Sequence, residues 1–203
     1  MNIPTIRAII LDFGGVLLHP GDPAVHEQLA QELGISVDTL QREIFVGPLS
    51  LAAQRGEISP QELWATLAQQ WGLPPEKGEW LAQRFWEGIR IDTDLADWLR
   101  QRKRRYRTGL LSNAWSDLRD LLHRVGIADA FDAMVISAEE HLMKPDPAIY
   151  RLILERLDVE PAEAVFVDDR LENVHAAHAL GMRTVQFRHR DQVMAELRNL
   201  GVG

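Results

Sequence analysis

Side chains that can act as nucleophiles, acids or metal ligands follow the ends of apolar runs in this sequence. Asp12 comes directly after the run AIIL and precedes Gly14 and Gly15, which allow the chain to turn. In an open α/β sheet, ligands bind in the crevice outside the carboxyl ends of the strands, so Asp12 is a candidate nucleophile or metal ligand. Comparable positions after later apolar runs hold Ser112, Asn113, Lys144, Asp168 and Asp169.

The adjacent acids Asp168 and Asp169 are the most informative of these later positions. They follow the run VFV in the segment VFVDDRLEN. Two neighbouring carboxylates repel each other unless a metal ion or a lysine neutralises them. A magnesium ion bound by Asp12 and one acid of this pair would meet that need, with water and a phosphate group completing the octahedron.

Three other residues have simpler explanations when each is taken alone. Ser112 is of a type that often caps the helix following a strand. Lys144 precedes a proline and fits an exposed loop. His19 lies close to Asp12 along the chain, but an isolated loop histidine is most often incidental, so we leave it out of the site.

Apolar runs of the length and composition of buried parallel strands recur along the chain. Amphipathic helical patterns at 114–125, 147–157 and 171–180 separate the last four runs, and two of these patterns end before a glycine. This β-α-β succession predicts a mainly parallel sheet with helices on both faces, so the candidate residues converge on one edge. The predicted strands are residues 6–11, 108–111, 133–136, 164–167 and 184–187.

Residues 19–90 contain no convincing strand but several helical patterns, at 24–33, 37–45, 60–71 and 76–88. The third pattern begins with the segment SPQE, which combines an N-cap serine, a proline at the first helical position and a glutamate three residues after the cap. Because both ends of this insert emerge beside Asp12, we interpret it as a cap over the sheet edge. Its tryptophans are expected to form the core of a small helical bundle rather than a substrate platform. They are Trp64, Trp71, Trp80 and Trp86.

The composition is typical of a globular chain with one α/β domain and an insertion: 203 residues, 46% hydrophobic and 26% charged. The absence of cysteine excludes disulfides, thiolate metal sites and a cysteine nucleophile. The net charge of −8 disfavours nucleic acid as a partner, and it requires any phosphate site to be locally cationic. The basic run at 100–107 lies at the expected end of a helix, where cations complement the helix dipole, and we interpret it as a solvated surface.

No apolar run is long enough for a signal peptide or for a membrane span. We therefore expect a cytoplasmic enzyme without a membrane partner.

The segments DFGGVL, LLSN, MKPDPAIY and VFVDDRLEN occur in this order across the whole chain. Together they resemble the four motifs of the haloacid dehalogenase-like hydrolase superfamily. The resemblance implies an α/β fold in which residues 1–18 and 91–203 form a Rossmann-like core. It implies that residues 19–90 form an α-helical cap domain inserted after the first motif.

The resemblance also implies a role for each motif residue. Asp12 would be the nucleophile that accepts a phosphoryl group, and Lys144 would steady that nucleophile and the phosphoryl charge. Ser112 and Asn113 would contact the phosphoryl oxygens.

The cofactor implied by the same resemblance is Mg²⁺. Its ligands would be Asp12, the backbone carbonyl of Gly14 and Asp169, with Asp168 in a supporting role. This is chemically coherent, because a carboxylate attacks phosphorus only where metal, lysine and hydrogen-bond donors offset the repulsion between two anions.

Gly14 departs from most phosphatases that the chain resembles, which have a second aspartate at this position. That aspartate protonates the leaving alkoxide and later activates water, a contribution of typically ~10²–10⁴-fold. Three interpretations are open. The chain is a phosphatase that relies on metal, solvent or a good leaving group, as in some sugar-phosphate phosphatases that also have glycine here; a metal-independent 2-haloacid dehalogenase; or a weakly active protein that binds phosphorylated ligands.

The acid pair Asp168–Asp169 favours the phosphatase, because dehalogenases need no metal and do not typically retain that pair. We therefore expect a magnesium-dependent hydrolase of small phosphomonoesters, sugar phosphates among them, with a small phosphorylated metabolite as its partner. No pattern in the sequence specifies an oligomeric state.

Overall fold

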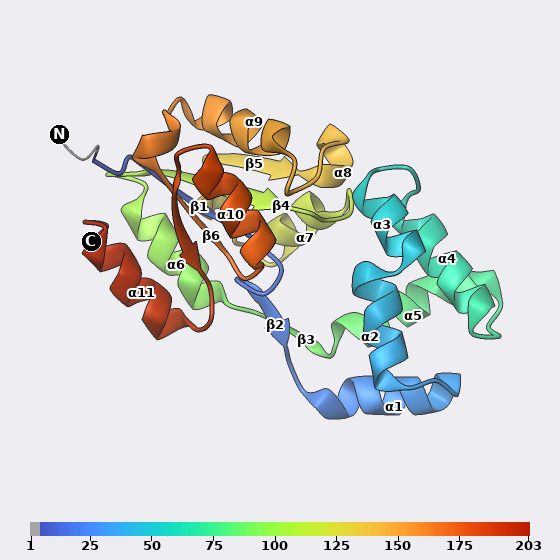
Figure 1. Ribbon diagram of the computed structural model, residues 1–203. Coiled ribbons are helices and arrows are strands. Elements are labelled where there is room, and N and C mark those ends of the chain that lie inside the picture. The colour runs from blue at the N-terminus through green and yellow to red at the C-terminus, as the bar shows by residue number, and fades with distance from the viewer. Residues whose placement is uncertain (1–4) are drawn as a thin grey trace.

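The computed structural model describes residues 5–203 and centres on a five-stranded sheet (Figure 1). The strands of this sheet are β1 (Ala8–Leu11), β4 (Arg107–Ser112), β5 (Ala133–Ile136), β6 (Ala164–Asp168) and β7 (Arg183–Gln186). Their order across the sheet is β5-β4-β1-β6-β7, and every neighbouring pair is parallel. The predicted α/β fold with a mainly parallel sheet is confirmed, and the ends of the predicted strands move by at most two residues.

Strand β1 lies at the centre because its four residues are all apolar and fully buried on both faces. Its last residue, Leu11, is level with Leu110 of β4 and with Val167 of β6. The residues that follow these three strands therefore emerge side by side at one edge.

Helices cover both faces of the sheet, and the alternation along β1 shows which helix covers which face. Ile9 and Leu11 pack in one hydrophobic cluster with α6 (Thr93–Arg102), α7 (Leu118–Arg124) and α11 (Arg190–Asn199). Ala8 and Ile10 pack in a second cluster with α9 (Pro147–Leu157) and α10 (Leu171–Ala179). Short turns complete the core: α8 (Ser137–Glu140), η2 (Ala128–Ala130) and η3 (Pro161–Glu163).

The segment between β1 and β4 contains a separate group of helices, called the helical insert below, which lies to one side of the sheet in Figure 1. It has its own hydrophobic cluster, with Leu40, Leu67 and Phe85 fully buried. The predicted capping box is present, since Glu62 N donates to Ser59 Oγ and Ser59 N donates to Glu62 Oε2. The insert consists of α1 (Pro23–Leu33), α2 (Val37–Val46), α3 (Pro48–Gln54), α4 (Pro60–Gln70), η1 (Pro75–Lys77) and α5 (Gly78–Trp86).

The prediction that residues 19–90 contain no strand is wrong at both ends of that range. Strand β2 (Leu18–Pro20) pairs antiparallel with β3 (Ile89–Ile91), and a bond from Gly21 N to Gly88 O continues the pairing. Each strand has only three residues, too few for an alternation that a sequence pattern could reveal. Both connections between core and insert therefore run through one two-stranded ribbon, and the proposed domain boundaries fall inside it.

The helical insert also contacts the core at the end remote from this ribbon. Ser137 Oγ of α8 donates to the carbonyl oxygen of Gln54 at 2.6 Å. Nδ1 of the His141 ring lies 2.9 Å from the carbonyl oxygen of Arg55. Trp115 Nε1 donates to Ser50 Oγ of α3 at 3.3 Å. The insert is thus held to the core at two separated places.

Several helices differ from the predictions. The helix expected at 114–125 begins only at Leu118, because the Ala114 carbonyl accepts from Ala138 N, and Leu118 N donates to the Trp115 carbonyl instead of to that of Ala114. Helices α3, α8 and α11 were not predicted; α3 begins at Pro48, directly after Gly47, and these two residues interrupt the helical pattern.

The basic run 100–107 spans the end of α6, as predicted, and Arg100 and Lys103 pair with Asp129 and Asp132. Within residues 5–203, no helix is both long and apolar enough to cross a bilayer. The first four residues of the predicted segment 1–18 lie outside the described residues.

Candidate active site

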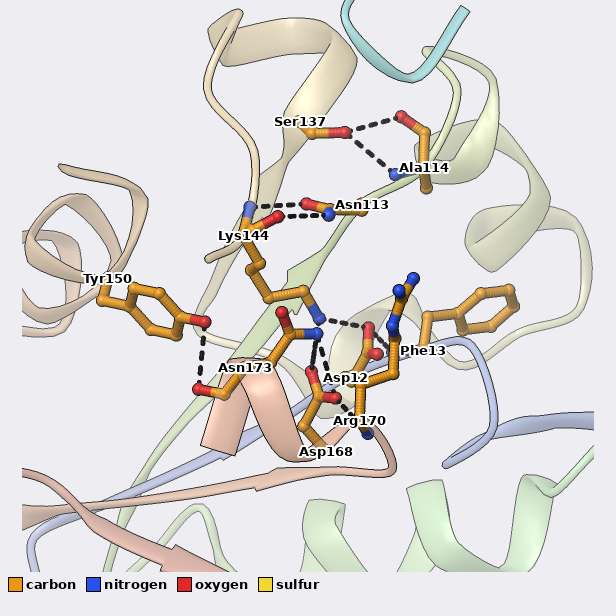
Figure 2. Close-up of polar contacts among 10 residues, drawn as sticks. All are labelled: Asp12, Phe13, Asn113, Ala114, Ser137, Lys144, Tyr150, Asp168, Arg170 and Asn173. Atoms are coloured by element: carbon orange, nitrogen blue, oxygen red, sulfur yellow. Dashed lines mark hydrogen bonds and ion pairs between the residues drawn. The ribbon is translucent and has the colours of Figure 1, made fainter. Parts of the chain in front are cut away.

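A buried lysine lies between two buried carboxylates at the carboxyl edge of the sheet (Figure 2). Lys144 Nζ is 2.8 Å from Asp12 Oδ1 and 2.7 Å from Asp168 Oδ2. The exposed fractions are 4% for Lys144, 6% for Asp12 and 0% for Asp168. An exposed-loop position for Lys144, the simpler explanation considered above, is therefore wrong.

Lys144 is held in place through its own backbone by Asn113. Asn113 Nδ2 donates to the Lys144 carbonyl oxygen at 2.9 Å, and Lys144 N donates to Asn113 Oδ1 at 2.8 Å. The side chain of Asn113 thus joins the loop after β4 to the loop that presents the lysine. Its amide is used to position Lys144, and direct contact with a phosphoryl group stays a prediction.

Asp168 is saturated with donors from the protein. Asn173 Nδ2 lies 3.1 and 3.0 Å from its two carboxylate oxygens, and Arg170 N donates to Oδ1 at 2.8 Å. Tyr150 in turn donates its hydroxyl to the Asn173 carbonyl oxygen at 3.1 Å. This arrangement fits a carboxylate that orients the lysine rather than one that reacts.

Asn173 and Tyr150 were not predicted as site residues. Asn173 lies within the segment VFVDDRLEN, at the start of a helix five residues after Asp168, and that position is a signal that could have indicated it. Tyr150 is the last residue of the segment MKPDPAIY, which is a comparable signal, although its contact with Asn173 depends on how α9 packs beside α10.

This cluster contains too little positive charge to neutralise its carboxylates. Burial, reinforced by the nearby Asp168 charge and opposed by Lys144, raises the pKa of Asp12 to about 7. Burial and the same Asp168 charge also raise the pKa of Asp169. One lysine therefore does not fully offset the negative charge gathered here.

Carboxylate oxygens of Asp12, Asp168 and Asp169 lie within 4.8 Å of one another, close enough to share one ion. Hard oxygen donors of this kind suit Mg²⁺, and the surplus negative charge calls for a divalent cation. Backbone hydrogen bonds in the loop after β1 fall on the carbonyls of Phe13 and Leu18. Among the described residues, none falls on the Gly14 carbonyl, which keeps its lone pairs. The residues present therefore fit the implied metal.

The two glycines after Asp12 have different surroundings. Gly15 has a φ of +72°, and a Cβ at this position would collide with the Asp169 carboxylate. The backbone of Gly14 is outside the left-handed region, and a Cβ there would have no atom within 4 Å. A glycine is thus required at position 15 for the close approach of the Asp169 carboxylate to the backbone, whereas Gly14 leaves room for a side chain.

A cavity of about 1190 Å³ lies between the helical insert and this edge of the sheet. Phe13, Gly14, Ser112 and Asn113 line its inner end. Ser112 is 2% exposed, and its hydroxyl makes no hydrogen bond with the described residues, so it is free to donate into the cavity. The structure thus unites Asp12, Lys144, Asp168 and Asp169 in one cluster and places Gly14, Ser112 and Asn113 on the adjoining cavity wall.

The structure also locates His19 and the four tryptophans of the insert, for which the sequence suggested no role in the site. His19 packs its ring 5.7 Å from that of Phe187 and does not line the cavity. Of the four tryptophans expected in the core of the insert, Trp64 is buried there, whereas Trp71, Trp80 and Trp86 are half-buried and pack against that core. However, Trp64 and Trp86 also face the cavity, because they lie on the side of the insert nearest the core.

Comparisons with known proteins agree with this geometry. A family model described as haloacid dehalogenase-like hydrolase matches residues 6–181. The chain is 32% identical over 205 residues to the sesquiterpene phosphatase astK of Aspergillus oryzae, covering 97% of each chain. It is 30% identical over 200 residues to the drimenol cyclase drtB of Aspergillus calidoustus, covering 96% of this chain but 36% of that protein.

A solved structure of a HAD family enzyme from Bacteroides thetaiotaomicron, in complex with magnesium and inorganic phosphate, has the same fold. Its TM-score is 0.74 at 22% identity, over 90% of this chain and 94% of that one. The family match over most of the chain, the curated relatives and the shared fold lead to one conclusion. This chain belongs to the haloacid dehalogenase-like hydrolase family.

Proposed function

We propose that this hydrolase is a Mg²⁺-dependent phosphatase that removes the phosphoryl group from small phosphomonoesters through an aspartyl-phosphate on Asp12. The observation that carries the proposal is the position of Asp12. Its carboxylate is buried, paired with Lys144 at 2.8 Å, and grouped with two further acids beside a large cavity. Two similar proteins, the sesquiterpene phosphatase of Aspergillus oryzae and the Bacteroides thetaiotaomicron enzyme solved with magnesium and phosphate, support the same reaction class.

In the first step an oxygen of Asp12 attacks phosphorus, and the bond between phosphorus and the alcohol oxygen breaks. The leaving alkoxide takes a proton from solvent water and departs as the alcohol. Lys144 holds the nucleophile and offsets charge on the phosphoryl group, and the Ser112 hydroxyl donates to a phosphoryl oxygen. Water then attacks the phosphorus of the aspartyl-phosphate, which releases inorganic phosphate and restores Asp12.

Asp12, Asp169 and the Gly14 carbonyl would hold Mg²⁺, with Asp168 supporting the site through Lys144. When bound, the ion supplies the positive charge that lets an anionic carboxylate approach an anionic phosphate. We also propose that residues 19–90 act as a cap domain, since the cavity is walled by the helical insert on one side and by the core on the other.

The deciding experiment measures phosphate release from acetyl phosphate, 4-nitrophenyl phosphate and a set of sugar phosphates, with Mg²⁺ and with a chelator. Wild type is compared with Asp12→Asn, which keeps the size of the side chain and removes the nucleophile. We expect release that needs both Mg²⁺ and Asp12, together with one phosphoryl group on the Asp12 peptide by mass spectrometry.

Release that survives either Asp12→Asn or chelation would refute the proposal. Metal-independent halide release from 2-chloropropionate would instead identify a dehalogenase. Stabilisation by phosphorylated ligands without turnover would identify a binding protein.

A further inference from the structure

The cavity beside Asp12 is far larger than a phosphoryl group requires. Its 1190 Å³ exceed the ~300–1,000 Å³ that are typical of small-molecule pockets. Because Phe13, Gly14 and Ser112 line its inner end, a phosphate bound at Asp12 would place its alcohol inside this space. The chemistry of the walls therefore determines which alcohol fits.

Aromatic and aliphatic side chains from the insert and the core form a large part of the cavity walls. Trp64 from α4, Trp86 from α5 and Trp115 from the loop after β4 contact one another edge to face, with ring centres 5.7 to 6.5 Å apart. Trp86 packs against the hydrophobic clusters of both the core and the insert. Leu18 and Leu118 extend this apolar surface on the core side. An alcohol in contact with these walls would lie against hydrocarbon.

Three polar side chains that line the cavity, those of Gln54, Asn113 and Trp115, already have partners in the protein. Gln54 Nε2 donates to Phe45 O and to Ser50 Oγ, at 3.0 and 3.2 Å. The indole N–H of Trp115 donates to the same Ser50 hydroxyl, and the Asn113 amide is paired with backbone. A polyol placed against these three side chains would lose hydrogen bonds to water and gain few from them.

The charges along the cavity disfavour a second anionic group on the substrate. Arg124 is the one cation among the described residues that line the cavity, and it is exposed. Four acids line it as well. They are Glu76, Glu79, Glu87 and Asp117.

From these walls we infer that the substrate is the phosphate monoester of an uncharged hydrocarbon alcohol, with a medium-length alkyl or prenyl chain. This inference rests on the proposed function for the position of the phosphate. The phosphoryl group binds at Asp12 and Lys144, and the hydrocarbon extends along Trp86, Trp115 and Trp64 towards Phe45. Sugar phosphates become the comparison class.

The test uses primary alkyl phosphates of increasing length, ethyl, hexyl and decyl, together with glucose 6-phosphate. All have primary alcohols of similar acidity as leaving groups, so differences report binding of the carbon chain. Each buried methylene increases kcat/KM by up to about fourfold, so hexyl phosphate is expected to exceed ethyl phosphate on the order of 10²-fold. Glucose 6-phosphate is expected to fall near ethyl phosphate.

Two neighbouring variants on α2 provide a matched pair. Phe45 and Val46 are both exposed, at 37% and 50%, but only Phe45 lines the cavity. Phe45→Ala is expected to lower the ratio of kcat/KM for decyl to ethyl phosphate several-fold, whereas Val46→Ala leaves that ratio unchanged. Ala82→Phe, which narrows the cavity from α5, is expected to lower the same ratio further.

The outcomes separate this inference from the proposed function. Hydrolysis of acetyl phosphate that needs Asp12 and Mg²⁺, combined with no dependence on chain length or with a preference for glucose 6-phosphate, overturns this inference alone. If no phosphate ester is hydrolysed, the binding of phosphonate analogues tests the inference instead. Decylphosphonate must then quench tryptophan fluorescence at far lower concentration than ethylphosphonate, with a loss in Phe45→Ala, and equal binding of the two would refute the inference.

Discussion

Replacing Gly14 with aspartate tests whether this site lacks a general acid. A Cβ at Gly14 meets no atom within 4 Å, and the backbone there suits any residue. Gly14 also lines the cavity that would hold the leaving group, so we expect a carboxyl group at this position to come within reach of the alcohol oxygen. The variant is therefore expected to fold and to place a proton donor where wild type has none.

The size of the effect follows from the leaving group. General acid catalysis is worth typically ~10²–10⁴-fold, or about 3–5 kcal/mol of barrier, and it matters most when the alkoxide is a strong base. Gly14→Asp should thus accelerate alkyl phosphates by this order and leave acetyl phosphate almost unchanged. The nearby carboxylates of Asp12 and Asp169 favour the protonated form of the new acid.

The assay is kcat/KM for a series of aryl and alkyl phosphates, plotted against the pKa of the leaving alcohol. Wild type should give a steep negative slope, and Gly14→Asp a shallower one. Gly14→Asn is the control, since it has the same shape and donates no comparable proton. Equal slopes for the two variants would refute the reasoning.

A shallow slope in wild type would likewise show that another group already supplies the proton. Asp117 would then be tested first, because it lines the same cavity and burial raises its pKa.

Three further predictions concern the charged cluster. Lys144→Met leaves the Asp12 and Asp168 carboxylates without their shared cation, so it should abolish turnover and lower the free energy of unfolding by about 3–5 kcal/mol at pH 8. Denaturant titration should show a smaller loss of stability at pH 5, where Asp12 is protonated. An equal loss at pH 5 and pH 8 would show that the ion pair is not the cause. Mg²⁺ should raise the melting temperature more at pH 8 than at pH 5. Because the folded-state pKa of Asp12 is raised to about 7, the metal-free protein loses stability as pH rises from about 4 to 7, and the ion binds the charged form of Asp12 that predominates above that range. An equal or larger shift of the melting temperature at pH 5, measured by calorimetry, would exclude Asp12 as a ligand. Asn113→Leu should lower kcat by about 10- to 100-fold with little change in KM, because it removes the hydrogen bonds that hold the backbone of Lys144 and removes no substrate contact. Steady-state kinetics that show a rise in KM alone would assign Asn113 to substrate binding.

Much of the sheet edge could be predicted from the sequence because buried parallel strands are apolar throughout and end abruptly at polar residues. Asp12 and Asp168 follow such runs directly, so their convergence required only the rule that parallel strands end on the same side. The roles of the loop residues depend on partners that are distant in the chain. Asn113 contacts Lys144 across 31 residues, and no local pattern encodes that contact.

The part of the site formed by the insert was the least predictable. Trp64 and Trp86 satisfy a helical packing pattern, and nothing in that pattern shows that the same rings also border a cavity. The ribbon of β2 and β3 was missed because each strand has three residues, and its stability comes from pairing between segments about 70 residues apart.

The two attachments of the helical insert limit how substrate and product can exchange. One is the ribbon of β2 and β3, and the other is the set of hydrogen bonds that Gln54 and Ser50 of α3 receive from the core. To swing open about the ribbon, the insert must first break the hydrogen bonds at α3. While those bonds hold, exchange passes through the exposed part of the cavity wall, which includes Phe45 and Glu79, so the dwell time of a released alcohol depends on those contacts rather than on the ribbon alone.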